Sequence, residues 1–206
     1  AFGHDPLHRS ASPAPPLHDA LAHVAVLLGS WSGTGRGEYP TIEAFEYAET
    51  ITFGHVGKPF LAYGQRTRAL VDGSPGLPLH AESGYWRFPS AGRVEVVIVH
   101  PTGVTEIEEG TLTSDGGAIV IDLATSTVGL TATAKSVTAI ERSFRIDAAA
   151  GTLSLNLDRF KTRPYGLAGG GPGASWGPPR LKPGRWTAEW RSPDLGDAEP
   201  SADLPR

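Results

Sequence analysis

The chain has 206 residues, carries a formal net charge of −4 and contains neither cysteine nor methionine. These facts exclude disulfides, thiol nucleophiles, cysteine-ligated zinc and iron–sulfur clusters, and the lack of an overall positive charge argues against nucleic acid or anionic membranes as partners. With 39% hydrophobic and 19% charged residues, the composition is typical of a globular domain. Because no apolar run approaches the roughly 20 residues of a membrane-spanning helix, we expect a soluble cytoplasmic protein.

The ends of the chain differ in texture from its centre. Residues 1–16 are rich in Pro, Ser and Ala, which favours a flexible arm. In residues 17–28, apolar side chains recur at helical spacing, and this predicts a short amphipathic helix that ends at Gly29. We expect the folded domain to occupy residues 17–191 and residues 192–206 to form a disordered tail.

Short β-rich runs follow the helix, separated by Gly, Pro, Ser and Asp, with no helical pattern between them. The runs cover residues 50–53, 60–70, 82–88, 93–100, 104–112, 118–123, 137–146, 152–157 and 185–191. Strands without intervening helices pair antiparallel. The prediction is therefore an all-β, lipocalin-like, antiparallel up-and-down barrel of about ten strands, with a two-sheet sandwich as the alternative. The polar residues of each alternating run should face water, and the interior should leave room for a ligand.

Glycines alternate in residues 29–42, which read GSWSGTGRGEYPTI. The spacing matches neither phosphate-binding loop pattern, so a nucleotide site is not indicated. In a strand, alternating glycines leave one face bare, and this permits close approach of a flat ligand. The alternative is a strand that bends at its glycines, with Trp31 as core packing.

This stretch resembles the GxWxGxGxGxYPTI signature of the nitrobindin family. Similarity continues at residues 45–69, 79–87, 100–110 and 133–147, and covers roughly residues 20–158. The resemblance implies a ten-stranded antiparallel barrel like that of fatty-acid-binding proteins, with haem b at one end. It also implies nitric oxide binding and isomerisation of peroxynitrite to nitrate by the ferric haem. Haem or a small apolar ligand is the expected partner, and the oligomeric state is left open.

The resemblance also implies which residues bind the cofactor. They are Gly29, Trp31, Gly33, Gly35, Thr41, His80 and Lys135. His80 matches a family histidine on the side of the pocket opposite the axial ligand, with an ordinary strand-end histidine as the alternative. Thr41 either contacts a haem propionate or caps a turn. Lys135 either pairs with a ligand carboxylate or is simply exposed.

The sequence departs from the family at the axial ligand, a histidine near the C-terminus. None of the seven histidines follows His100, and the nearest local match places Gly184 at the ligand position. Residues 159–184 match the family poorly, through divergence or through a shifted reading frame. We therefore expect a nitrobindin-like binding protein deficient in iron ligation. One alternative is a ferric haem peroxynitrite isomerase with another ligand, and a further one is a barrel filled by Trp186 and Trp190.

Few other residues suggest chemistry, and no catalytic or metal-ligating residue is assigned. Glu106 and Glu108 share one face of a strand and Glu109 takes the other, a pattern that we interpret as a solvated surface. His100 precedes a proline and His55 lies in a turn-like stretch, so structural roles are expected for both. No spacing of the H-x-H or H-E-x-x-H type indicates zinc.

Overall fold

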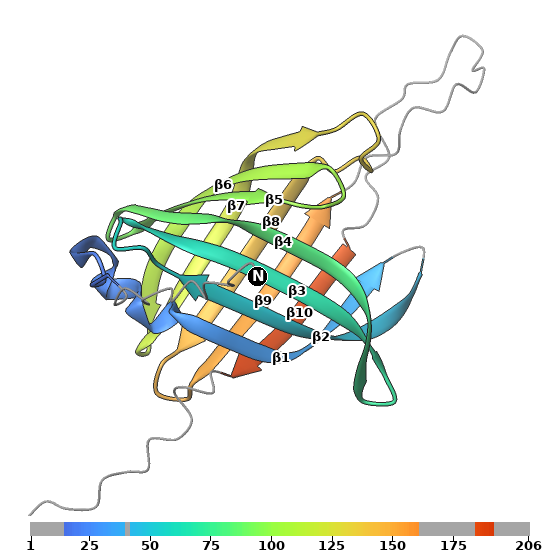
Figure 1. Cartoon of the computed structure of the whole chain (residues 1–206), viewed down its shortest axis with the longest axis horizontal. Helices are drawn as coiled ribbons and strands as arrows, with labels where there is room; N and C mark the ends of the chain where they lie inside the picture. Colours follow the sequence, from blue (N-terminus) through green and yellow to red (C-terminus); the bar gives the residue numbers. More distant parts are fainter. Residues whose placement is uncertain (1–14, 40–41, 161–183, 192–206) are drawn as a thin grey trace, which may run out of the picture.

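In the computed structural model, residues 15–39, 42–160 and 184–191 are described, and they form one short helix, η1 (Asp19–Leu27), and a closed antiparallel barrel (Figure 1). The strands are Gly29–Tyr39 (β1), Ile42–Gly54 (β2), Phe60–Val71 (β3), Ser74–Ser90 (β4), Arg93–Val99 (β5), Val104–Asp115 (β6), Ala118–Leu130 (β7), Ala139–Asp147 (β8), Thr152–Phe160 (β9) and Gly184–Arg191 (β10). Each strand pairs with its neighbour in sequence, and β1 pairs with β10 to close the barrel. The predicted all-β antiparallel barrel with a short N-terminal helix is confirmed.

Three strands are much longer than the sequence pattern indicated, and one of them, β7, ends at Leu130 rather than near residue 123. Strand β2 begins at Ile42 rather than near residue 50, and β4 begins at Ser74 rather than near residue 82. The first part of β4 is largely exposed, and it therefore lacks the alternation of buried and exposed side chains that marks a strand in sequence.

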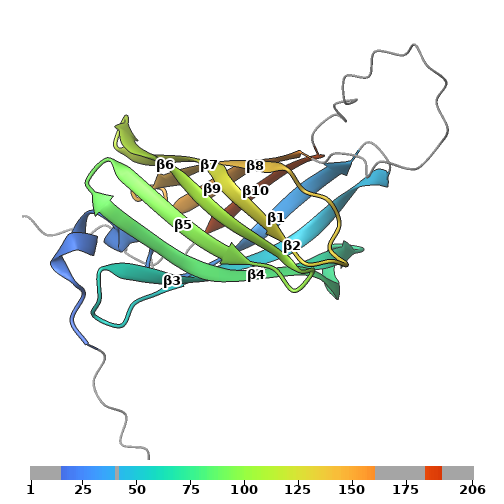
Figure 2. The same ribbon diagram turned by 90° about the horizontal axis from the view of Figure 1, so that it is seen from above.

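Helix η1 lies at one end of the barrel (Figures 1 and 2). It is a 3₁₀ helix, so its buried face has a period of three and consists of Leu21, Val24 and Leu27. Leu28, which α-helical spacing would place on this face, is instead the C-cap residue and is only partly buried. The indole Nε1 of the fully buried Trp31 donates a hydrogen bond to the Leu27 carbonyl at 2.9 Å, which joins the helix to β1.

An aromatic core fills the barrel near the helix. The rings of Phe53 and Phe144 each pack against Trp86, with centroids 5.2 Å apart in both pairs, and Tyr63 lies beside Phe53 and Trp86. All four side chains are buried. This half of the interior is therefore a conventional apolar core, and any functional chemistry must lie farther along the barrel.

Several expectations fall on parts of the chain that are not described. The flexible arm falls there except for residues 15 and 16, as do the tail at 192–206 and Thr41. The backbone of β10 confirms a strand at residues 185–191, but the side chains of Trp186 and Trp190 lie outside the described set. The limits of the domain, 17–191, stay a prediction. Among the described helices, none is long and apolar enough to cross a membrane.

Candidate functional site in the barrel interior

The glycine-rich strand β1 turns its bare face toward the barrel interior. Trp31 and Gly37 on this face are buried, Gly33 and Gly35 are partly buried, and the residues between them are exposed. A Cβ added at Gly35 would lie 2.4 Å from Cζ of Tyr47 and 2.7 Å from the carbonyl oxygen of Thr187 on β10. The bare face therefore admits an aromatic side chain of the protein itself, and Trp31 is core packing, as the alternative interpretation held.

Beyond the aromatic core, charged and polar side chains form a buried layer that we call the polar layer. It consists of Glu49, Tyr63, Gln65, Glu82, His100, Glu106, Glu108 and Arg142. These residues come from five strands and the end of β5, and their alternation with exposed neighbours points all of them inward. A charged layer inside a barrel of this size is costly unless its groups pair with one another.

Arg142 on β8 is the centre of the polar layer. Its Nη1 and Nη2 atoms lie 2.9 and 3.3 Å from the two oxygens of Glu82, Nη2 lies 2.8 Å from Glu106, and Nε lies 2.9 Å from Glu108. One guanidinium thus binds three carboxylates from two strands, in the fork geometry that suits arginine. Tyr63 adds a hydrogen bond of 2.7 Å from its hydroxyl to Glu82.

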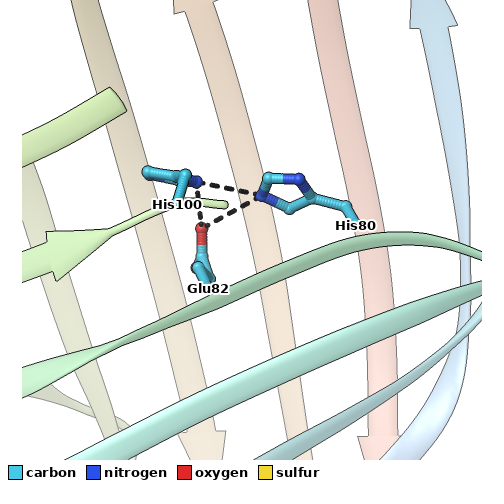
Figure 3. Close-up of side chains that lie close together, drawn as sticks. All are labelled: His80, Glu82 and His100. Atoms are coloured by element: carbon cyan, nitrogen blue, oxygen red, sulfur yellow. Dashed lines mark hydrogen bonds and ion pairs between the residues drawn. The ribbon is translucent and has the colours of Figure 1, made fainter. Parts of the chain in front are cut away.

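Two histidines lie beside Glu82: His100, which belongs to the polar layer, and His80, which borders it (Figure 3). His100 Nε2 lies 2.6 Å from a carboxylate oxygen of Glu106, and His100 Nδ1 lies 3.0 Å from Nε2 of His80. Oε2 of Glu82 lies 3.5 Å from His100 Nδ1 and 3.7 Å from His80 Nε2. His100 is almost fully buried, whereas 27% of the His80 side chain is exposed, so His80 is the member of the group that solvent or a ligand can reach.

Local backbone features place both imidazoles. His100 opens a tight turn into β6, in which Gly103 has a φ of +82° and its N–H donates to the His100 carbonyl. His80 follows a β-bulge, since Thr67 on β3 pairs with His80 but Arg68 pairs with Pro78, which leaves Leu79 unpaired. Bulges re-aim neighbouring side chains and are common beside functional sites.

Burial and neighbouring charges shift the pKa values of the carboxyls in opposite directions. Burial favours the neutral forms of Glu82 and Glu106, but it is outweighed by Arg142 and the histidines, and the pKa of Glu106 falls to about 2 while that of Glu82 falls well below its usual range. For Glu108 burial prevails and, with nearby Glu106, raises the pKa to about 7. Burial and the charge of Glu82 raise the pKa of Glu49 to about 8.

The structure corrects the prediction for the acidic residues of β6. Glu106 and Glu108 do share one face and Glu109 the other, but the shared face is fully buried and only Glu109 is exposed. Gln65 likewise faces inward and donates a hydrogen bond to Glu49, although the polar residues of its run were expected to face water. The alternation showed which residues share a face. The acidic face was interpreted as the exposed one, because Arg142, the partner of Glu106 and Glu108, lies on a distant strand and cannot be recognised from the local pattern.

The remaining candidate residues are dispersed. Gly29 begins β1 with a φ of 107° next to the helix, and Lys135 is exposed in the segment before β8. His55 lies in a loop, as predicted, where its Nδ1 accepts a hydrogen bond from the Gly57 N–H. Of the proposed cofactor-binding residues, His80, Gly33 and Gly35 are the ones that line the interior beyond the aromatic core.

A surface hollow of about 590 Å³ runs along β1, β9 and β10, and it is lined largely by outward-facing residues such as Thr34, Arg36 and Asn156. A second, of about 370 Å³, is lined by outward-facing residues of β6, β7 and β8, with Asp122 and Glu141 among them. Both hollows lie on the outside of the wall, so neither is the expected ligand site.

Comparisons with known proteins give this geometry a context. Residues 20–165 match the model of the THAP4-like, heme-binding beta-barrel domain. "Peroxynitrite isomerase 2" of Mycobacterium ulcerans is 57% identical over 130 residues, which are 63% of this chain and 79% of the relative. "Peroxynitrite isomerase" of Nocardia farcinica is 53% identical over 134 residues, 65% and 78% of the two chains.

A solved structure agrees with this assignment. The crystal structure of Rv2717c from M. tuberculosis superposes with a TM-score of 0.70 at 43% identity, and the match covers 86% of this chain and 99% of that one. The family match spans more than half of the chain and includes both β1 with its glycines and the whole polar layer. The chain therefore belongs to the THAP4-like, haem-binding β-barrel family, which is the nitrobindin family that the glycine signature had indicated.

Proposed function

We propose that this protein binds haem b in the half of the barrel opposite helix η1 and isomerises peroxynitrite to nitrate. The carrying observation is that the family fold presents a reachable imidazole, His80, on the inner side of the barrel wall beyond the aromatic core. The names of the curated relatives supply the reaction. A ferric haem, when bound, would supply the site at which nitric oxide or peroxynitrite binds.

The interior residues suit the porphyrin ring better than they suit the iron. Gly33 and Gly35 leave β1 without side chains, and Phe45 and Tyr47 on β2 add aromatic surface beside them. At the position of the family's axial histidine, however, stands Gly184, which has no donor atom. Lys161, Tyr165 and Lys182 precede it in sequence and lie outside the described residues.

Within this proposal, the protein's own contribution is a supported imidazole. Glu106 accepts a hydrogen bond from the Nε2–H of His100, and His100 Nδ1 in turn accepts one from the Nε2–H of His80. This chain fixes the ring of His80 and holds a proton on the nitrogen that faces His100. When Nδ1 of His80 also carries a proton, that N–H can donate a hydrogen bond to an anion held in the pocket, a contact worth about 1.5–3 kcal/mol because both partners are charged.

Titration of the purified protein with hemin, followed by stopped-flow measurement of peroxynitrite decay and nitrate yield, tests the proposal. We expect saturable binding, catalysed nitrate formation, and a loss of activity of about tenfold or more in His80→Ala with haem still bound. His55→Ala is the matched control, because it removes an imidazole in the loop between β2 and β3, outside the polar layer. Absence of saturable hemin binding would refute the proposal.

Gly184 favours a second candidate: a barrel that carries haem or another apolar ligand without holding the iron through an imidazole. This candidate predicts a hemin spectrum without the features of histidine ligation and no isomerase activity. The substitution Gly184→His should then produce both a histidine-ligated hemin spectrum and isomerase activity. If the wild-type protein already shows a histidine-ligated spectrum and turns over peroxynitrite, the second candidate is wrong.

A further inference from the structure

We propose that His80, Glu82 and His100 form a binding site for a divalent transition metal, with zinc the best match. The inference concerns the apo barrel and does not rest on the proposed haem chemistry. The three residues lie on β4 and at the end of β5, and their ligand atoms face one another (Figure 3).

The distances between the ligand atoms are those of a metal site. His80 Nε2, His100 Nδ1 and Glu82 Oε2 form a triangle with edges of 3.0, 3.5 and 3.7 Å. A point about 2.0 Å from all three atoms lies at its centre, and zinc binds imidazole nitrogen and carboxylate oxygen at about 2.0–2.2 Å. The site therefore needs almost no rearrangement to accept the ion.

The surrounding residues hold these ligands in the required state. Glu106 lies 2.6 Å from Nε2 of His100 and accepts a hydrogen bond from the N–H at that position. The other nitrogen of the ring, Nδ1, therefore keeps its lone pair, and this lone pair faces the triangle. Carboxylate–histidine–metal chains of this kind orient most protein-bound zinc ions. Glu82 is oriented as well, by Tyr63 and Arg142, and its Oε2 has the longer arginine contact, of 3.3 Å, besides its contacts with the two histidines.

Charge also favours a cation here. In the described interior, Glu82 and Glu106 have lowered pKa values and are ionised, and they face a single buried guanidinium, that of Arg142. Buried carboxylates in excess of their partners are costly, and a divalent ion offsets part of that cost.

Three protein ligands leave a tetrahedral zinc one open position. Since His80 is the exposed member of the triangle, water or a small anion can reach that position. The structure thus predicts an open metal site rather than a closed structural one. The sequence singled out His80 but did not show that the three residues form one site, because His100 is 20 positions from His80 and follows another strand.

The experiment uses the full chain, freed of haem and metal with a chelator. Zinc is titrated in by calorimetry, and cobalt(II) replaces it for absorption spectroscopy. We expect one equivalent of zinc to bind and cobalt to give the intense visible bands of tetrahedral coordination. Glu106→Gln should weaken zinc binding by about 10- to 100-fold through the orientation of His100, and His80→Ala by at least as much.

His55→Ala is the matched control and should bind zinc as the wild type does. Circular dichroism establishes that the variants fold, and if His80→Ala does not, His80→Asn replaces it. No zinc binding at micromolar concentrations, a cobalt spectrum of octahedral type, or equal affinities of the His80 and His55 variants would overturn the inference. In those cases the two imidazoles simply share a hydrogen bond. Failure to bind hemin would leave these results unaffected.

Discussion

Arg142 is the residue on which the barrel interior depends most. It neutralises carboxylates on β4 and β6 from its place on β8, so it links three strands that are not all neighbours. Its own burial disfavours the charged form, but Glu108, Glu82 and Glu106 raise its pKa well above the usual range. The guanidinium is therefore permanently charged, and its removal leaves buried anions without a partner.

Arg142→Met should lower the free energy of unfolding by about 3–5 kcal/mol, the usual cost of breaking a buried ion pair on one side. Arg145→Met is the matched control on the same strand, because Arg145 pairs with Asp115 at 2.7 Å on the exposed surface. That change should cost at most about 1 kcal/mol. Urea denaturation of both variants measures the difference, and equal losses would show that the polar layer does not depend on its arginine.

Glu49 should make stability dependent on pH in the metal-free protein. Because its pKa is about 8 in the folded state and ordinary in the unfolded state, the folded state binds the extra proton, and stability falls as pH rises toward 8. Glu108, with a pKa of about 7, contributes to the same fall at lower pH. For each proton that the folded state binds and the unfolded state does not, the free energy of unfolding falls by about 1.4 kcal/mol per pH unit.

Unfolding free energies measured between about pH 7 and 8 test this, because Glu49 dominates the slope there. Glu49→Gln should flatten the wild-type slope in that interval, whereas Glu109→Gln, on the exposed face of β6, should leave it unchanged. A wild-type stability that stays constant or rises over the interval would contradict the assignment.

At the scale of elements, β1 shows what alternation can and cannot reveal. Its glycines predicted a bare inward face, and the structure has one, but the sequence does not say what fills it. Tyr47 does so at Gly35, because the register of β1 and β2 pairs these two residues directly. Register between strands arises from the closed sheet as a whole and is not encoded in either strand alone.

Gly35→Ala should therefore destabilise the protein by about 1–3 kcal/mol, since the added methyl group meets both the ring of Tyr47 and the backbone of β10. Gly54→Ala is a suitable control at the end of β2, where an added Cβ would meet no atom within 4 Å. Thermal unfolding of the two variants makes the comparison. If Gly35→Ala is as stable as Gly54→Ala, the close packing of Tyr47 on β1 is wrong.

The polar layer shows the limit of sequence reasoning at this scale. Runs such as β8 place Ile140, Arg142 and Phe144 on one face, and a charged residue between two apolar ones is a sign that the face is buried with a partner. The partners of Arg142 are 34 to 60 positions away, so local patterns cannot identify them. The short N-terminal helix, in contrast, was predictable, because it depends on apolar residues that are close together in sequence.

For the whole molecule, closure depends on β10. This strand pairs with β1 on one side and with β9 on the other, and it follows the stretch that least resembles the family. Without it, β1 and β9 would both present unpaired backbone donors and acceptors, which favour association with other chains. The antiparallel barrel was predictable from the strand pattern, but the pairing that closes it was not.

A chain that ends at residue 183 should therefore form oligomers or aggregates, while a chain that ends at residue 191 should behave as the full-length protein does. Size-exclusion chromatography of the two truncated chains distinguishes them. Should both elute with the same apparent size and unfold at the same temperature, β10 would not be needed for closure.

The sharing of one guanidinium by three acids also has an evolutionary consequence. Contributions of groups in such a network are strongly non-additive, so the effect of one replacement depends on which others have already occurred. Loss of Arg142 before its partners leaves buried carboxylates without a counter-charge. If the acids are replaced by neutral residues first, the arginine is no longer needed to neutralise them. Descendants of this barrel can thus abandon the arrangement only along certain orders of mutation, and we expect its members to be inherited or lost together.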